Sequence, residues 1–351
     1  MLSRVADSIY WMARYVERAE NISRLLLSTQ DLLLDAGAEA ADARQFWEPI
    51  LLATGDHAAF AALYPDIEGD EVAQFLTLRP ENANSMLNSV RAARENARTV
   101  RDQISDELWE CVNSLKLFLE SREARDMQQE QPAAFYEKVL MSSYQFQGVA
   151  ESTTPRGDSW YFLRLGMVLE RADKISRLLD TCSGLSMEMA PHPASRPLRW
   201  SALLRSCSAW HAFRSLSARP DPAKIVDYLL LESGFPRSIA CCVEELHTIL
   251  QALSGERPGE HLIKPVRLAG RLAADLRYST VDEILEAGLH SFIDDLQSRL
   301  NDIGDSIFET FVLYADLTPV AGGTVSRYAP PQPGAWHGFP SQEEQTQQQQ
   351  Q

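Results

Sequence analysis

Apolar residues recur at three- and four-residue spacing over most of this chain, whereas strict alternation of apolar and polar residues is scarce. Because that spacing places apolar side chains on one face of a helix, the pattern predicts an all-α protein. Asn-Gly and Asp-Gly hairpin turns are also absent. The clearest predicted helices cover Ser3–Asp35, Asn82–Glu120, Ala133–Glu151, Asp158–Cys182, Pro236–Ala252 and Val281–Val312.

Helix-breaking residues divide the chain. The sequence Thr154-Pro155-Arg156-Gly157 separates two halves, and the three prolines between Ser183 and Pro197 predict a loop there. After Leu317 the composition shifts to glycine, proline and a final run of glutamine. This composition predicts a disordered tail over residues 318–351.

The second half repeats a motif of the first half. The segment Glu17–Leu26 matches Glu170–Leu179 at eight of ten positions, with an offset of 153. The same offset pairs Trp47 with Trp200, and a constant register over such a distance indicates duplication. We therefore expect two tandem, pseudo-symmetric helical-bundle repeats, over residues 1–153 and 154–317.

Charge and cysteine content narrow the function classes. The chain has 33 Lys and Arg against 49 Asp and Glu, and its net charge is −16. This acidity argues against nucleic acid and anionic membranes as partners, since both bind cationic surfaces. Five cysteines without CxxC spacing suggest a reducing compartment. Neither a signal peptide nor a long apolar run is recognisable, so we expect a cytoplasmic location.

Four ordered blocks carry a family resemblance. They are SIYWMARYVERAENISRLL, NANSMLNSVRAARENARTVRDQIS with the following Trp109 and Asn113, LRLGMVLERADKISRLLD, and FPRSIACCVEEL. Together they resemble the bacterial alpha-E domain family over roughly residues 1–315. The resemblance implies an all-helical fold without an established activity. It also implies two partners, an ATP-grasp ligase-like protein and a transglutaminase-like protein, because such genes are commonly neighbours. That context suggests a role in making or processing amide bonds.

A polar stripe runs along each of two predicted helices. Guanidinium groups spaced along such a stripe could bind carboxylate or phosphate, with glutamates ordering them. The candidate ligand- or partner-binding residues are Tyr10, Arg14, Glu17, Arg24, Asn88, Arg91, Arg94, Glu95 and Arg98.

Two structural interpretations compete with a binding site. The stripe could be a solvated face with weak ion pairs, or a polar seam between the repeats. The residues expected in a structural ionic seam are Arg18, Glu170, Arg171 and Arg177. The second copy has Glu244 and His247 where the first has Arg91 and Arg94, so we expect a single binding site weighted towards the first copy.

Catalytic and metal signatures are weak. Glu244-x-x-His247 has the spacing of a dimetal carboxylate site, but a second such pair is missing, so we expect no metal and no cofactor. Walker, GxSxG and HExxH motifs are also missing. The leading hypothesis is an accessory protein that presents a peptide or acidic substrate to an ATP-grasp amide ligase, or docks that ligase. The alternative is an enzyme acting on a peptide or amide, with Glu17 or Glu170 as general base.

Overall fold

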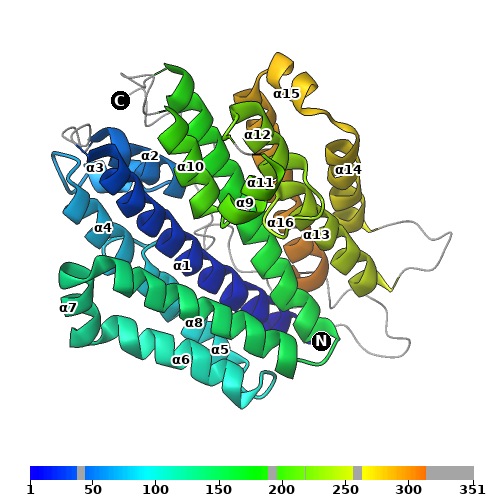
Figure 1. Ribbon diagram of the computed structural model, residues 1–351. Coiled ribbons are helices and arrows are strands. Elements are labelled where there is room, and N and C mark those ends of the chain that lie inside the picture. The colour runs from blue at the N-terminus through cyan, green and yellow to red at the C-terminus, as the bar shows by residue number, and fades with distance from the viewer. Residues whose placement is uncertain (38–43, 189–195, 218, 256–262, 314–351) are drawn as a thin grey trace, which may run out of the picture. The chain divides into compact units, whose positions relative to one another are not determined.

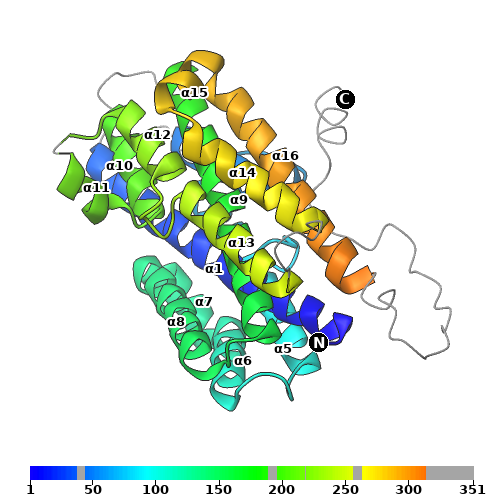
Figure 2. The same cartoon turned by 90° about the vertical axis from the view of Figure 1, so that its right-hand side faces the viewer.

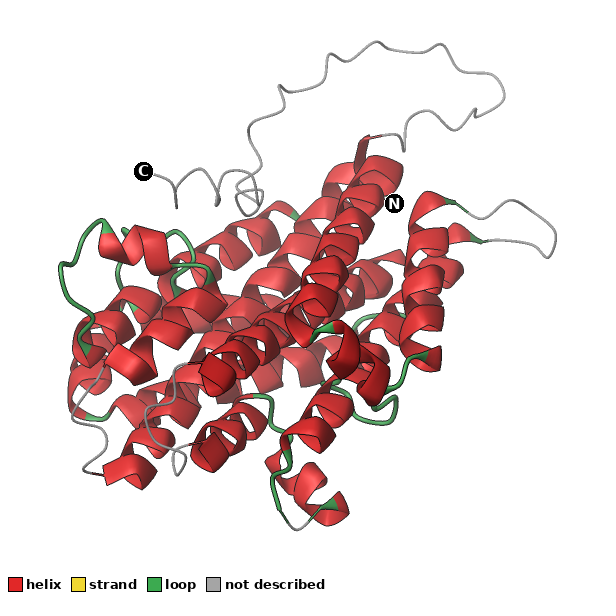
Figure 3. Ribbon diagram, turned by 90° about the horizontal axis from the view of Figure 1, so that it is seen from above, coloured by secondary structure: helices red, strands yellow, loops and turns green. Residues whose placement is uncertain are grey.

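The computed structural model describes residues 1–37, 44–188, 196–217, 219–255 and 263–313. Within these ranges the chain forms helices joined by turns, and no strand occurs (Figure 3). The expected all-α fold class is therefore confirmed. None of the described helices is long and apolar enough to cross a membrane. The tail predicted over residues 318–351 lies outside the described residues.

The described residues form the helices α1 to α16 and a final π-helical segment, in the order that Figure 1 labels. The first half contains α1 (Ser3–Ala36), α2 (Arg44–Thr54), α3 (His57–Ala61), α4 (Gly69–Thr77), α5 (Met86–Thr99), α6 (Asp106–Glu120), α7 (Arg122–Glu130) and α8 (Pro132–Thr153). The second half contains α9 (Asp158–Glu188), α10 (Arg196–Ser206), α11 (Trp210–Leu216), α12 (Pro222–Leu231), α13 (Ile239–Ser254), α14 (Lys264–Tyr278), α15 (Val281–Ala287) and α16 (Leu289–Phe308), followed by a π-helical segment, Glu309–Leu313.

Local sequence signals explain where several helices begin. Ser85 precedes α5 and Ser238 precedes α13, and each hydroxyl accepts a hydrogen bond from a backbone amide three residues later. Such a cap satisfies an amide that has no partner within the helix. Pro132 and Pro222 lie in the first turn of α8 and α12, where a missing N–H costs nothing.

The predicted helix Asn82–Glu120 is wrong as one element, because it is two helices. The break falls between Thr99 and Asp106 and contains neither glycine nor proline, so the apolar spacing did not reveal it. Ser105 explains why a new helix, α6, begins after it. Its hydroxyl accepts from the amide of Leu108 and also bonds Thr153, so it caps α6 instead of continuing α5.

Two further boundaries differ from prediction. The helix expected over Val281–Val312 is interrupted at Gly288, whose φ of +105° is a conformation that glycine adopts readily. The loop expected over Ser183–Pro197 is shorter, because α9 extends to Glu188 and α10 begins at Arg196. Residues 189–195 of that loop lie outside the described residues.

Two long helices, α1 and α9, lie at the centre of the described domain and pack along each other (Figures 1 and 2). Around α1 lie α5, α8 and α10, and around α9 lie α13, α16 and α2. Besides the other central helix, each therefore packs against helices of its own half and of the other half. Buried apolar side chains form two clusters, and α1 contributes to both, with Val16 in one and Leu26 in the other.

Candidate functional site

The backbones of α1 and α9 approach each other closely at Gly166. A Cβ atom added there would collide with the carbonyl oxygen of Tyr10 and lie 3.2 Å from the Cβ of Ala13. A larger residue would push the two helices apart, so this contact depends on glycine. Ala13 and Gly166 are 153 positions apart, which places the crossing at matching positions of the two motifs.

Beyond the crossing, the two Glu-Arg pairs exchange partners. Arg18 Nε donates to Glu170 Oε1 at 2.7 Å, and Arg171 Nε donates to Glu17 Oε1 at 2.9 Å. Glu17 is 1% exposed and Glu170 is fully buried. Each glutamate of one motif therefore pairs with the arginine of the other motif, in the interior of the protein.

The Glu170 cluster consists of Glu170, Arg14, Arg18, Asp173, Lys174 and Arg177. Arg14 Nε donates to the second carboxylate oxygen of Glu170 at 2.8 Å. Lys174 Nζ lies 3.3 Å from Asp173 and 3.8 Å from Glu170, and Arg177 pairs with Asp173 at 3.0 Å. A buried carboxylate needs this degree of pairing, because an uncompensated charge in the interior is costly.

The Glu17 cluster consists of Glu17, Glu20, Arg24, Arg171 and Arg237. Arg237 lies in the turn before α13 and bonds Glu17 at 3.3 Å; it also bonds Glu20. Arg24 pairs with Glu20 one helical turn away, and its guanidinium bonds the hydroxyl of Tyr144 at 2.8 Å. Together the two clusters form a buried ionic seam between α1 and α9.

The arginines determine the protonation of both central glutamates. Burial alone would raise the pKa of Glu17, but Arg171 and Arg237 outweigh it and lower that pKa to about 2. Burial is likewise outweighed by Arg18 and Arg14 at Glu170, whose pKa is also lowered. A carboxylate with so low a pKa is a weak proton acceptor near neutral pH. The geometry therefore disfavours Glu17 or Glu170 as a general base.

A small cavity with both polar and apolar lining residues borders the Glu170 cluster. Arg18, Asn84, Asp56 and Lys174 line it, and its volume is about 20 Å³. Asn84 donates to Asp56 at 3.0 Å, and burial raises the pKa of Asp56. A cavity of this volume accommodates one water molecule beside these polar side chains, not a substrate. The seam therefore has the character of a packed scaffold.

The second group of candidate residues lies on the surface. We call Arg91, Arg94 and Arg98 the α5 arginine face. Arg91 pairs with Glu120 at 2.9 Å, while Arg94 and Arg98 share Glu95 at 2.6 and 2.8 Å. The side chains of Arg91 and Arg98 are 42% and 62% exposed. Asn88 accepts from Arg91 at 3.3 Å, and the guanidinium of Arg94 lies 5.2 Å from the ring centre of Trp109.

The structure thus separates the predicted stripe into two places. Tyr10, Arg14, Glu17 and Arg24 lie in or beside the seam, where the Tyr10 hydroxyl accepts from Arg14 at 3.1 Å. The remaining candidates lie on α5, apart from the seam, and they are Asn88, Arg91, Arg94, Glu95 and Arg98. The residues expected in a structural seam, Arg18, Glu170, Arg171 and Arg177, all belong to the two clusters.

Sequence reasoning missed Arg237, a member of the Glu17 cluster, and Asn84, which contacts the Glu170 cluster. Arg237 and Asn84 are 153 positions apart, and each directly precedes a capping serine. Asn84 accepts from Arg18 at 3.3 Å, and Arg237 bonds Glu17. The constant offset was the signal that could have identified them as matching contacts with the two motifs.

A surface cluster of Asp180, His290 and Asp294 also escaped the sequence analysis. Their ligand atoms lie within 4.8 Å of one another, although 110 residues separate Asp180 from His290. His290 Nδ1 lies 2.7 Å from Asp180, and this hydrogen bond raises the pKa of His290. A histidine that favours its protonated form is a poor metal ligand, so the arrangement fits an ion pair.

The whole helical region matches one family model. The model covers residues 1–312, and its description is "A predicted alpha-helical domain with a conserved ER motif". This chain belongs to the Alpha-E family. The two Glu-Arg pairs of the seam have the composition that the family description names. In this Alpha-E chain they lie side by side in the interior and neutralise each other across the helix crossing.

The relatives found for this Alpha-E chain are uncharacterized proteins. Mb2597 of Mycobacterium bovis, and MT2643 and Rv2567 of Mycobacterium tuberculosis, are each 24% identical to it over 351 residues. The match covers 93% of this chain but 39% of each relative, so the chain spans well under half of their length. No solved structure matches it.

Proposed function

We propose that this Alpha-E protein is a helical accessory protein of an ATP-grasp amide-bond-forming system. In this proposal the α5 arginine face presents a peptide or acidic substrate, or docks the ligase, while the ionic seam holds the scaffold. The observation that carries the proposal is the exposure of Arg98 and Glu95, whose side chains are 62% and 56% exposed. Arg91 and its partner Glu120 are 42% and 30% exposed, and Arg94 is 27% exposed.

Exposure makes these ion pairs exchangeable. An exposed pair contributes about 0–1 kcal/mol to stability, because water and salt screen it. A carboxylate of a binding partner can therefore replace Glu95 or Glu120 at little cost. Arginine also presents a planar fork of donors that fits a carboxylate with two hydrogen bonds. Replacing a carboxylate partner in the buried seam would instead leave that carboxylate buried without a cation.

The longer relatives support a role beside another protein region. In each mycobacterial relative, more than half of the chain lies outside the part that matches this protein. The Alpha-E region is thus one part of a larger polypeptide there. This arrangement supports a module that works with a partner region, and the family resemblance suggests the ATP-grasp enzyme as that partner.

We also propose that the fold arose by internal duplication. The starts of α5 and α13, Met86 and Ile239, are 153 positions apart, as are His57 and Trp210 at the starts of α3 and α11. Packing repeats as well, since α5 and α8 lie on α1 as α13 and α16 lie on α9. At the positions that match Arg91, Arg94 and Arg98, the second half has Glu244, His247 and Gln251. The proposed binding face therefore belongs to the first half alone.

A triple substitution tests the proposed function. Arg91→Gln, Arg94→Gln and Arg98→Gln together should weaken binding to the ATP-grasp protein of the same host by about tenfold or more at low ionic strength. Raising the salt concentration should reduce the difference, because screening weakens exposed attraction. The dissociation constant can be measured by isothermal titration calorimetry.

The matched control replaces three exposed arginines on α14. Arg267→Gln, Arg271→Gln and Arg277→Gln change the net charge equally, yet should leave the dissociation constant close to that of the unaltered chain. If both triple variants weakened binding equally, the effect would come from the change in net charge and not from the α5 arginine face. Normal binding by the α5 variant at low salt, or its failure to fold, would contradict the proposal.

A further inference from the structure

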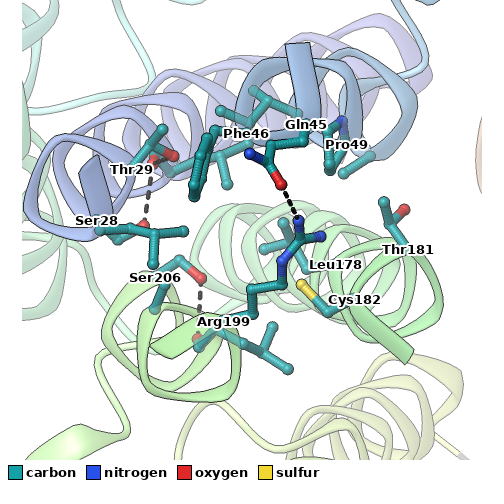
Figure 4. A pocket seen from close by; sticks show the side chains of 16 residues that line it. Ser28, Thr29, Gln45, Phe46, Pro49, Leu178, Thr181, Cys182, Arg199 and Ser206 are labelled. Atoms are coloured by element: carbon teal, nitrogen blue, oxygen red, sulfur yellow. Dashed lines mark hydrogen bonds between the residues drawn. The ribbon is translucent and has the colours of Figure 1, made fainter. Parts of the chain in front are cut away.

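A second cavity, of about 60 Å³, lies where α1, α2, α9 and α10 meet (Figure 4). None of its lining residues belongs to α5 or α6, so it is separate from the α5 arginine face. Many lining residues form pairs 153 positions apart, such as Pro49 with Ala202 and Phe46 with Arg199. The last pair replaces an aromatic ring by a cation. Among these matched lining residues, Arg199 is therefore the one difference in charge between the two sides of the cavity.

Arg199 is the one charged residue among those that line this cavity, and it is only 8% exposed. Its Nη2 lies 3.5 Å from the side-chain oxygen of Gln45, and its guanidinium lies 5.8 Å from the ring centre of Phe46. Its Nε has no hydrogen-bond partner among the described residues, and no carboxylate of those residues pairs with it. By contrast, Arg205 on the same helix pairs with Asp35 at 3.2 Å.

Neighbouring side chains do not neutralise this cation. Cys182 lies beside Arg199 in the cavity (Figure 4), but burial raises the pKa of its thiol to about 12, so it stays uncharged. The hydroxyls of Ser28, Thr29 and Ser206 donate to backbone carbonyls of their own helices. Among the residues that the structure describes, the guanidinium is therefore a strong donor without an anionic acceptor, next to apolar walls.

We propose that this cavity binds a short aliphatic monocarboxylate, whose carboxylate pairs with Arg199 and whose hydrocarbon part packs against Leu25, Ile50 and Leu178. A buried arginine without an anion is unfavourable, and a carboxylate satisfies its fork with charge-assisted hydrogen bonds. An inorganic anion would leave the apolar walls unfilled. A neutral apolar molecule would leave the charge unpaired.

The volume limits the size of the ligand. A cavity of about 150 Å³ binds benzene, so about 60 Å³ encloses only the carboxylate and the first carbons of the ligand, and the rest of a chain of roughly three to five carbons extends to the open side of the cavity. Because the cavity shares no residue with the α5 arginine face, this site and the proposed docking function can be tested separately.

Butyrate is the probe that tests this site on the full chain. A ligand that binds the folded state alone raises the melting temperature, and saturation-transfer NMR detects the binding directly. We expect sodium butyrate to raise the melting temperature above that in sodium chloride of equal ionic strength. Butyramide, which has nearly the same shape without the charge, and inorganic phosphate should not do so.

Substitutions at Arg199 complete the test. Arg199→Gln should abolish the effect of butyrate, and Arg199→Leu should abolish it while raising the melting temperature of the free protein, since a buried unpaired charge is removed. Arg214→Gln, an exposed arginine on α11, is the matched control and should respond like the unaltered chain. If Arg199→Gln fails to fold, the melting temperature of Arg199→Leu with and without butyrate tests the site instead.

Three results would overturn the assignment. The first is an absence of any effect of butyrate beyond that of chloride. The second is an equal effect of butyramide or phosphate, which would remove the need for a carboxylate with an apolar body. The third is a full butyrate effect in a folded Arg199→Leu protein, which would place the binding elsewhere.

Discussion

Arginines meet carboxylates in two regions of this chain whose surroundings are opposite. In the ionic seam, Glu17 and Arg171 are 1% and 5% exposed. On the α5 arginine face, the side chains of Glu95 and Arg98 are 56% and 62% exposed. Water is excluded from the first pair and screens the second. The same two residue types can therefore hold the scaffold in one place and remain available to a partner in the other.

The two halves of the seam differ as well. Glu170 receives its second arginine, Arg14, from α1, whereas Glu17 receives Arg237 from the turn before α13. The positions that match Arg14 and Arg237 in the other half hold Met167 and Asn84. Neutralisation of each buried glutamate is thus common to both halves, while the source of the extra cation differs.

Removing a seam carboxylate should have the largest effect. Glu17→Ala leaves Arg171 and Arg237 buried without their partner, and we expect a loss of about 3–5 kcal/mol in the free energy of unfolding, measured in urea. Glu95→Ala, on the exposed face, is the matched control and should change it by less than about 1 kcal/mol. An unchanged unfolding midpoint for Glu17→Ala would show that the seam does not stabilise the fold.

The helix crossing should be the next most sensitive feature. Gly166→Ala places a Cβ against the carbonyl oxygen of Tyr10, and we expect a loss of about 1–3 kcal/mol from the forced separation of α1 and α9. Gly148→Ala is the control within α8, since a Cβ there meets no atom within 4 Å. That substitution should stabilise the protein by about 0.5–1 kcal/mol. If Gly166→Ala and Gly148→Ala changed the free energy of unfolding equally, the close approach of α1 and α9 would not depend on glycine.

Acid should destabilise the seam. Because the pKa of Glu17 is about 2 when folded and ordinarily 4.5, protonation favours the unfolded chain, so stability falls as pH drops through this range. Glu170 acts in the same direction. Burial and the charge of Glu17 raise the pKa of Glu20, which contributes stability that is lost as pH rises. Urea unfolding from pH ~7 to ~3 should show a net fall that Glu17→Gln makes shallower; the same slope in that variant would refute the assignment.

The α5 triple variant should have the smallest effect on folding. Replacing Arg91, Arg94 and Arg98 by glutamine removes exposed pairs, each worth about 0–1 kcal/mol, so the melting temperature should change little. Circular dichroism should report the same helix content as in the unaltered chain. Loss of cooperative unfolding would show that this face belongs to the scaffold.

The sequence predicted the fold class well because helical periodicity is a local property. It offered a polar seam between the repeats as one structural alternative, and the match of Glu17 with Glu170 at one offset was consistent with that alternative. It could not separate Tyr10 and Arg14 from Arg91 and Arg98, because burial depends on which helices pack together. No sequence pattern indicated that Arg199 would be buried without a carboxylate partner. Its isolation arises from the meeting of four helices, and no spacing along the chain encodes that.

A pair of double-mutant cycles tests the central distinction most directly. One cycle combines Glu17→Gln with Arg171→Met, and the other combines Glu95→Gln with Arg98→Met, with the free energy of unfolding as the readout. We predict a coupling energy of about 2 kcal/mol or more for the buried pair and less than about 0.5 kcal/mol for the exposed pair. Equal coupling energies in the two cycles would contradict the division into a structural seam and an exchangeable surface.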